Sequence, residues 1–92
     1  MGEAAVEQDG IAVTVRYFAA ARAAAGAEAE TVVVRPGTTV GGLVERLAVR
    51  GSRLATVLSR CSYLCDGVAV RDETAPLRSG NTIDVLPPFA GG

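Results

Sequence analysis

The clearest structural signal of the chain is Ile11-Ala-Val-Thr-Val-Arg-Tyr-Phe18, in which large apolar residues alternate with small or polar ones. A period of two is typical of a β-strand with one buried face, and the odd-numbered residues from 11 to 17 share that face. The stretch Thr82-Ile-Asp-Val-Leu86 alternates in the same way, with Ile83 and Val85 on one side. We expect these two strands to pair in parallel at the centre of one sheet.

A helix is predicted between them. Its apolar residues, spaced i, i+3, i+4, i+7, are Val40, Leu43, Val44 and Leu47, which indicates an amphipathic helix over 39–50. Thr38 or Thr39 can cap its start, and Gly51 is expected to end it. A second, short helix over 52–60 is expected to begin with Ser52 as its cap.

Shorter signals complete the order of elements. They are a helical turn at 19–25 ended by Gly26, strands at 30–35, 62–65 and 68–70, turns at 36–37 and 66–67, and a loop at 72–79. The first two strands are expected to form an antiparallel hairpin with a long loop. The order predicts an α+β fold of the β-grasp (ubiquitin-like) type: a mixed sheet of about five strands, one main helix, one short helix and a free C-terminal tail.

Length and composition predict one domain. The chain has 92 residues, of which 49% are hydrophobic, enough for one core. Residues 1–10 are small and polar and are expected to be a disordered N-terminal extension, so the domain is placed at 11–92 with its tail at 87–92. Because there is neither a basic-then-apolar leader nor an apolar run of about 18 residues, we expect a cytoplasmic protein without a membrane contact.

The charged residues exclude several functions. The net charge is −1, and the nine basic residues are all arginine and scattered along the chain, which argues against nucleic acid. Histidine and lysine are absent, so the usual general base, Schiff-base amine and commonest metal ligand are missing.

Cys61 and Cys65 lack the spacing of a zinc site. They are interpreted as partly buried structural thiols, with sulfur handling as the alternative.

The chain ends in Pro87-Pro88-Phe89-Ala90-Gly91-Gly92. The prolines cannot continue a sheet ladder, so they end the last strand and set an extended path. The four residues after Pro88 can reach about 13 Å, and glycine keeps the end slim. We therefore expect the chemistry to take place on the Gly92 carboxylate, in the narrow active site of another protein. The alternative is a chance Gly-Gly end in a chain with 11 glycines.

Three motifs resemble those of the ubiquitin-like sulfur carriers of the MoaD/ThiS type. They are Tyr17-Phe18-Ala-Ala-Ala-Arg22 followed by Gly26, Pro76-Leu77-x-x-Gly80-x-x-Ile83, and the Pro-Pro-x-x-Gly-Gly tail. The similarity runs over residues 11–92 and is greatest to the carriers that serve molybdopterin synthase. Ala23, Cys65-Asp66-Gly67 and Asn81 depart from the family's usual Glu, Val-Asn-Gly-type turn and acidic residue.

The resemblance implies a mechanism and partners. An ATP-consuming, E1-like adenylyltransferase and sulfurtransferase would adenylate Gly92, and a persulfide would convert it to a thiocarboxylate. The sulfur would then pass to a cyclic pyranopterin on the large catalytic subunit of molybdopterin synthase, in a heterotetramer. The chain itself would bind no cofactor and would not be an enzyme on its own.

The resemblance also assigns residues. Gly91 and Gly92 would enter the partner's active site, and Phe18, Arg22, Pro87, Pro88, Phe89 and Ala90 would contact the partner. Phe89 can instead pack on its own sheet, and Phe18 can instead belong to the core. Alternative functions are a sulfur carrier for cysteine or thiamine synthesis, a ubiquitin-like modifier, or an interaction module.

Overall fold

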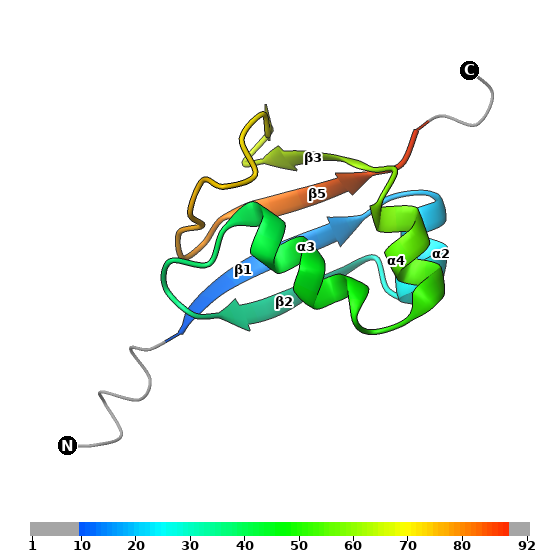
Figure 1. The fold of residues 1–92 in the computed structure, drawn as a ribbon, viewed down its shortest axis with the longest axis horizontal. Helices are drawn as coiled ribbons and strands as arrows, with labels where there is room; N and C mark the ends of the chain where they lie inside the picture. Colours follow the sequence, from blue (N-terminus) through cyan, green and yellow to red (C-terminus); the bar gives the residue numbers. More distant parts are fainter. Residues whose placement is uncertain (1–9, 89–92) are drawn as a thin grey trace.

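The computed structural model describes residues 10–88 (Figure 1). Residues 1–9 of the expected extension over 1–10, and the tail residues Phe89, Ala90, Gly91 and Gly92, lie outside the described residues. The elements are, in chain order, β1 (Ile11–Tyr17), α2 (Ala20–Ala25), β2 (Ala29–Val34), α3 (Val40–Ala48), α4 (Ser52–Leu58), β3 (Ser62–Cys65), β4 (Val68–Ala69) and β5 (Thr82–Leu86).

All five strands form one mixed sheet in the order β2-β1-β5-β3-β4. The first and last strands are paired in parallel, with Val15 opposite Ile83 and Tyr17 opposite Val85. The pairs β1–β2, β3–β5 and β3–β4 are antiparallel. The predicted sheet, its central parallel pair and its long-looped hairpin are therefore confirmed, and the α+β β-grasp fold with them.

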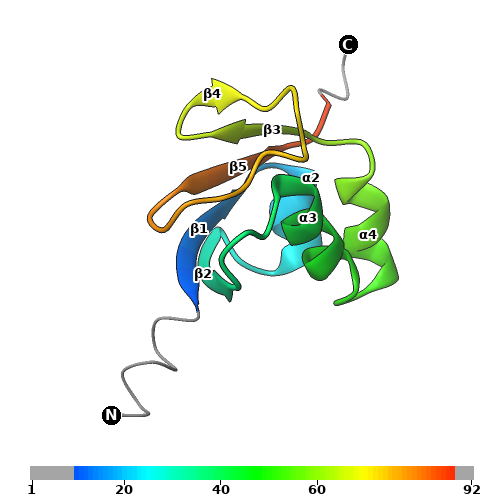
Figure 2. The ribbon, with the colours of Figure 1, turned by 60° about the vertical axis from the view of Figure 1, so that its left-hand side comes forward.

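The hydrophobic core lies between one face of the sheet and the helices, which all lie on that face in the part of the chain that the structure describes (Figure 2). From the sheet come the buried alternating residues Val13, Val15, Tyr17, Ile83 and Val85, and from the helices Ala21, Val40, Leu43, Leu47, Leu54 and Leu58. Leu77, in the loop before β5, is also buried. The predicted periodicities of two and of 3.6 thus mark the core correctly.

The helix caps were predicted with mixed success. Thr39 caps α3 as expected, because its Oγ1 accepts a hydrogen bond from the Gly42 backbone N–H at 3.0 Å. Ser52 does not cap α4: it is the first helical residue, and Gly51 is the cap, with no side-chain hydrogen bond. Gly51 also does not end α3, which stops at Ala48. The physical reason is that Gly51 is extended, with φ 175°, and starts the next helix instead.

Two turns require glycine. Gly26 ends α2 in the left-handed region, with φ 78°, as predicted. Asp66 and Gly67 form the tight turn between β3 and β4 with φ values of 50° and 83°, a pair of positive values typical of a two-residue hairpin. The strand expected at 68–70 has only two residues, and Val68 is 68% exposed. β4 is therefore a short, exposed strand at one edge of the sheet.

Candidate functional site

The C-terminal tail begins at its root, Pro87 and Pro88, directly after a strand in the interior of the sheet. β5 lies between β1 and β3, and its last residue, Leu86, is paired with Ser62 of β3. Pro87 follows half-buried, and Pro88 is exposed. Since proline has no backbone N–H to donate, the ladder stops here and the chain leaves the sheet, as predicted. The tail thus starts from a strand that is fixed on both sides.

Phe18 lies at the same end of the sheet. It directly follows β1, and because Tyr17 is level with Val85, Phe18 is placed one residue further, beside the end of β5. Its backbone N–H donates to the Val85 carbonyl at 3.2 Å. The side chain is half-buried and is not part of the hydrophobic core. The Arg16 guanidinium lies 5.7 Å from the centre of its ring, within cation–π range.

Arg22 is exposed on α2, whose Ala21 is buried against the core. Helix α2 packs against α4, and Figure 1 shows both helices at the end of the sheet where β5 ends. The structure therefore brings Phe18, Arg22, Pro87 and Pro88 to one end of the molecule. The other four predicted site residues, from Phe89 to Gly92, lie outside the described residues.

A small hollow at this end contains residues that the sequence analysis missed. It has a volume of about 180 Å³ and is lined by Ala20, Thr56, Val57, Arg60, Pro87 and Pro88. The signal that could have found Arg60 is the strand order. A residue just before β3 must lie beside a residue just after β5, because β3 and β5 are antiparallel neighbours with Ser62 opposite Leu86.

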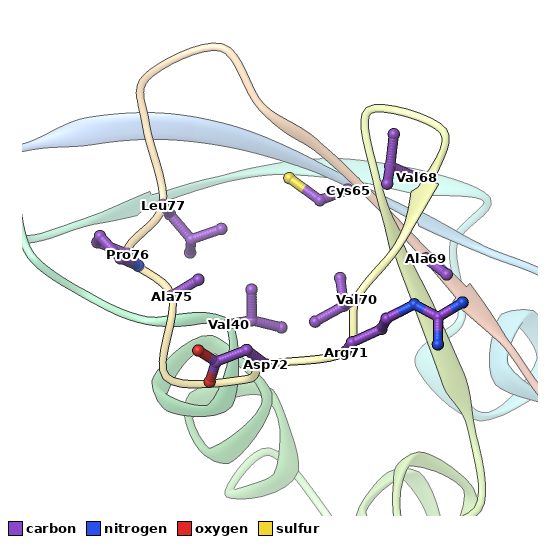
Figure 3. Close-up of a pocket in the computed structure, with 10 residues that line it drawn as sticks. All are labelled: Val40, Cys65, Val68, Ala69, Val70, Arg71, Asp72, Ala75, Pro76 and Leu77. Atoms are coloured by element: carbon purple, nitrogen blue, oxygen red, sulfur yellow. The ribbon is translucent and has the colours of Figure 1, made fainter.

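A larger hollow, of about 470 Å³, lies between the β3–β4 hairpin, the loop that precedes β5 and the start of α3 (Figure 3). Val40, Val70 and Leu77 form part of its apolar lining, and Cys65 and Val68 come from the β3–β4 hairpin. Cys65 is paired with Ile83 near the start of β5, whereas the tail leaves from the end of β5. This hollow shares no lining residue with the small hollow beside Pro87 and Pro88 and is not part of the candidate site.

The cysteines are ordinary, partly buried thiols. Both are free, and Cys61 donates a hydrogen bond to the Val57 carbonyl at 3.2 Å. Burial raises the pKa of both thiols, and the neighbouring Asp66 carboxylate raises the pKa of Cys65 further. A raised pKa lowers the thiolate fraction and thereby the reactivity. The interpretation as structural thiols agrees with this geometry.

Among residues 10–88, no three His, Cys, Asp or Glu side chains are grouped so that they could hold a metal ion. Within the same range, no helix is both long and apolar enough to cross a membrane.

The sequence profile of the ThiS family matches residues 15–92. The comparison with curated proteins gave no significant match.

Solved structures with the same fold include a candidate molybdopterin converting factor subunit 1 from Pyrococcus furiosus, at 24% identity and TM-score 0.78 over 86% of this chain and 99% of that one. The small archaeal modifier protein SAMP1 from Haloferax volcanii is 22% identical, with TM-score 0.77 over 88% and 99% of the two chains. A complex of subunits 1 and 2 of the molybdopterin-converting factor from Helicobacter pylori gives 22% identity and TM-score 0.66 over 89% and 100%. At these identities the likeness shows the ubiquitin-like fold.

Proposed function

We propose that this chain carries sulfur as a thiocarboxylate on Gly92. The chain belongs to the ThiS family of small ubiquitin-like sulfur carriers. The observation that supports this most directly is the root of the tail. β5 is held between two strands, and Pro87 and Pro88 then direct the chain away from the sheet. The family profile runs on through the tail to residue 92. A fixed base with a slim end suits a group that must enter another protein's active site.

The chemistry requires activation of a carboxylate, which is a poor electrophile. Attack of the Gly92 carboxylate on ATP would form an acyl adenylate and release pyrophosphate. The outer sulfur of a persulfide would then displace AMP and form an acyl disulfide. A second thiol would attack the cysteine sulfur of that acyl disulfide, which releases the thiocarboxylate and joins the two cysteine sulfurs in a disulfide. All these groups come from the partner. The chain needs only to present its end, which fits its lack of lysine and histidine.

The acceptor that we propose is a cyclic pyranopterin bound to the large catalytic subunit of molybdopterin synthase, with this chain as the small, non-catalytic subunit of a heterotetramer. Support comes from the Pro-Pro-x-x-Gly-Gly tail and Arg22 in the sequence, and from the fold shared with subunit 1 in the Helicobacter pylori complex. Phe18, which lies outside the core, and Arg22 would contact that subunit. Phe89 and Ala90 would lie at the entrance to the active site of that subunit, and Gly91 would occupy a passage too narrow for a Cβ atom.

A second candidate function is a ubiquitin-like protein modifier. It is favoured by the fold of the modifier SAMP1, whose TM-score is close to that of the Pyrococcus furiosus protein. A carrier for cysteine or thiamine synthesis would use the same tail chemistry with another acceptor.

Intact mass distinguishes these functions. The full chain is incubated with ATP, an E1-like activating enzyme and a persulfide donor, and reactions without ATP serve as controls. Replacement of one oxygen by one sulfur supports a carrier, whereas adducts on lysines of other proteins support a modifier. No change of mass would contradict both. For a carrier, conversion of a cyclic pyranopterin by the loaded chain and the large subunit tests the proposed acceptor.

A further inference from the structure

The small hollow beside the tail carries a positive charge that the proposed chemistry does not use. Besides Ala20, Thr56 and Val57, it is lined by Arg60 on one side and by Pro87 and Pro88 on the other. We propose that Arg60 binds a carboxylate side chain on the rim of the activating enzyme's cleft when the tail enters it. This inference rests on the proposed sulfur-carrier function, since it assumes that the tail is inserted into such an enzyme.

The backbone on both sides of Arg60 is held in place by hydrogen bonds. The chain continues beyond α4 in hydrogen-bonded turns: the Arg60 N–H donates to the Val57 carbonyl at 3.0 Å, and the Cys61 N–H donates to the Leu58 carbonyl at 3.1 Å. Ser62 then enters β3 opposite Leu86. The backbone that carries the guanidinium is thus tied to the same strand from which the tail leaves. A group that binds Arg60 is therefore placed in a defined position relative to the tail.

The two helical segments at this end of the molecule carry charges of one sign. The segments 19–25 and 51–61, which contain α2 and α4, hold Arg22, Arg53 and Arg60 and no acidic residue, although the whole chain has a net charge of −1. All three arginines are exposed. Within residues 10–88 the recorded ion pairs are Arg16–Asp84 and Arg50–Glu30, so neither involves Arg60. Charge complementarity therefore favours an acidic partner surface at this end of the molecule.

The length of the tail determines which anionic group Arg60 can bind. The adenylate would form on Gly92, four residues after Pro88, so an extended tail carries its phosphate up to about 13 Å beyond the hollow. Arg60 is beside Pro87 and Pro88 at the root. It is thus positioned for what surrounds the entrance of the cleft rather than for the nucleotide inside it. A guanidinium binds a carboxylate with two parallel hydrogen bonds, so the planar fork suits an Asp or Glu side chain.

The test compares Arg60→Glu with Arg53→Glu. Both variants change the net charge equally at exposed arginines, but Arg53 does not line the hollow. Initial rates of thiocarboxylate formation are measured by intact mass against carrier concentration, with activating enzyme, ATP and a persulfide donor. We expect Arg60→Glu to raise KM by roughly ten- to a hundredfold, the worth of a charged hydrogen bond, with kcat changed less than about threefold and Arg60→Lys in between. Arg53 lies at the start of α4, away from the hollow, so Arg53→Glu reports only the long-range attraction of this surface and should raise KM less than about threefold.

Each other outcome overturns the inference. An unchanged KM for Arg60→Glu would show that Arg60 does not bind the partner. An equal rise of KM for Arg53→Glu would show general electrostatic attraction instead. A faster reaction of Arg60→Glu would mean that Arg60 restrains the chain's own terminal carboxylate. If the wild-type chain acquires no sulfur, the proposed function fails as well, whereas loading with an unchanged KM in Arg60→Glu contradicts this inference alone. The thermal unfolding midpoint of each variant confirms that the fold is kept.

Discussion

Arg16 and Asp84 form a two-pronged ion pair across the parallel strands β1 and β5. Arg16 Nε donates to Asp84 Oδ1 at 2.6 Å, and Arg16 Nη2 donates to Asp84 Oδ2 at 2.8 Å. The register places the two residues side by side on the face of the sheet away from the helices. Asp84 is nevertheless only 5% exposed, and its hydrogen bonds and charge raise the pKa of Arg16. A buried carboxylate at the centre of the sheet is thus compensated by an arginine 68 residues away.

Removing only one partner of this pair is expected to destabilise the fold. Arg16→Leu leaves the buried Asp84 carboxylate without its two donors, so the thermal unfolding midpoint should fall by roughly 5 to 15 °C. The double variant Arg16→Leu/Asp84→Leu replaces both groups by apolar ones and should recover at least half of that loss. Calorimetry of the wild type, both single variants and the double variant measures the coupling. Additive losses would contradict the pairing.

The two tyrosines, the only ones in the chain, are predicted to make the fold sensitive to alkali. Tyr17 Oη donates to Glu30 Oε2 at 2.6 Å, and Tyr63 Oη donates to the Leu58 carbonyl at 2.8 Å. Burial raises the pKa of both phenols well above the ordinary value of 10.0, and the Glu30 carboxylate raises that of Tyr17 further. The unfolded chain therefore loses these protons first. Stability is retained below pH 10 and falls above it, by up to about 1.4 kcal/mol per tyrosine and pH unit.

Phenolate absorbance provides the measurement. In the folded protein it should stay flat as the pH passes 10, and it should then rise together with the loss of circular dichroism. Tyr17→Phe keeps one phenol and should halve the absorbance change. A gradual titration near pH 10 with the fold intact would show that the phenols are accessible.

The sequence predicted those parts of the fold that depend on local patterns. Alternation at 11–17 and 82–86 identified the central strands, since a period of two is visible without knowledge of the partner strand. The same alternation separates Asp84 from the core residues Ile83 and Val85, but it could not show that Asp84 would be buried and paired with Arg16. Ser52 was predicted as a cap because serine is a good capping residue, yet the chain starts α4 from Gly51. Cap position depends on backbone angles that residue type alone does not determine.

The candidate site was predictable to a similar degree. Phe18, Arg22, Pro87 and Pro88 were identified from motifs, and the structure places all four at one end of the sheet. Arg60 was missed because it belongs to no motif. Its position follows from the neighbourhood of β3 and β5, which is a property of the strand order rather than of the local sequence.

The cysteines are expected to be dispensable for sulfur loading. Because the pKa of each thiol is raised, the thiolate fraction at neutral pH is lower than in free cysteine. Alkylation by iodoacetamide at neutral pH should be at least about threefold slower than for a cysteine in an unfolded peptide. The double variant Cys61→Ser/Cys65→Ser should gain the sulfur at the wild-type rate to within about twofold. A large loss in a variant that unfolds like the wild type would assign the thiols a part in the transfer.

The end of the chain is predicted to tolerate no change in length. Deleting Gly92 withdraws the reacting carboxylate by one residue, about 3.3 Å, and appending an alanine advances it by the same amount. A misplacement of this size in a confining active site should lower sulfur loading at least about a hundredfold. Both variants should unfold like the wild type, because the sheet ends at Leu86. Pro88→Ala, which keeps the length, is the matched control and should load sulfur at a measurable rate. Normal loading of either length variant, followed by intact mass, would show that the terminal carboxylate is not the group that reacts.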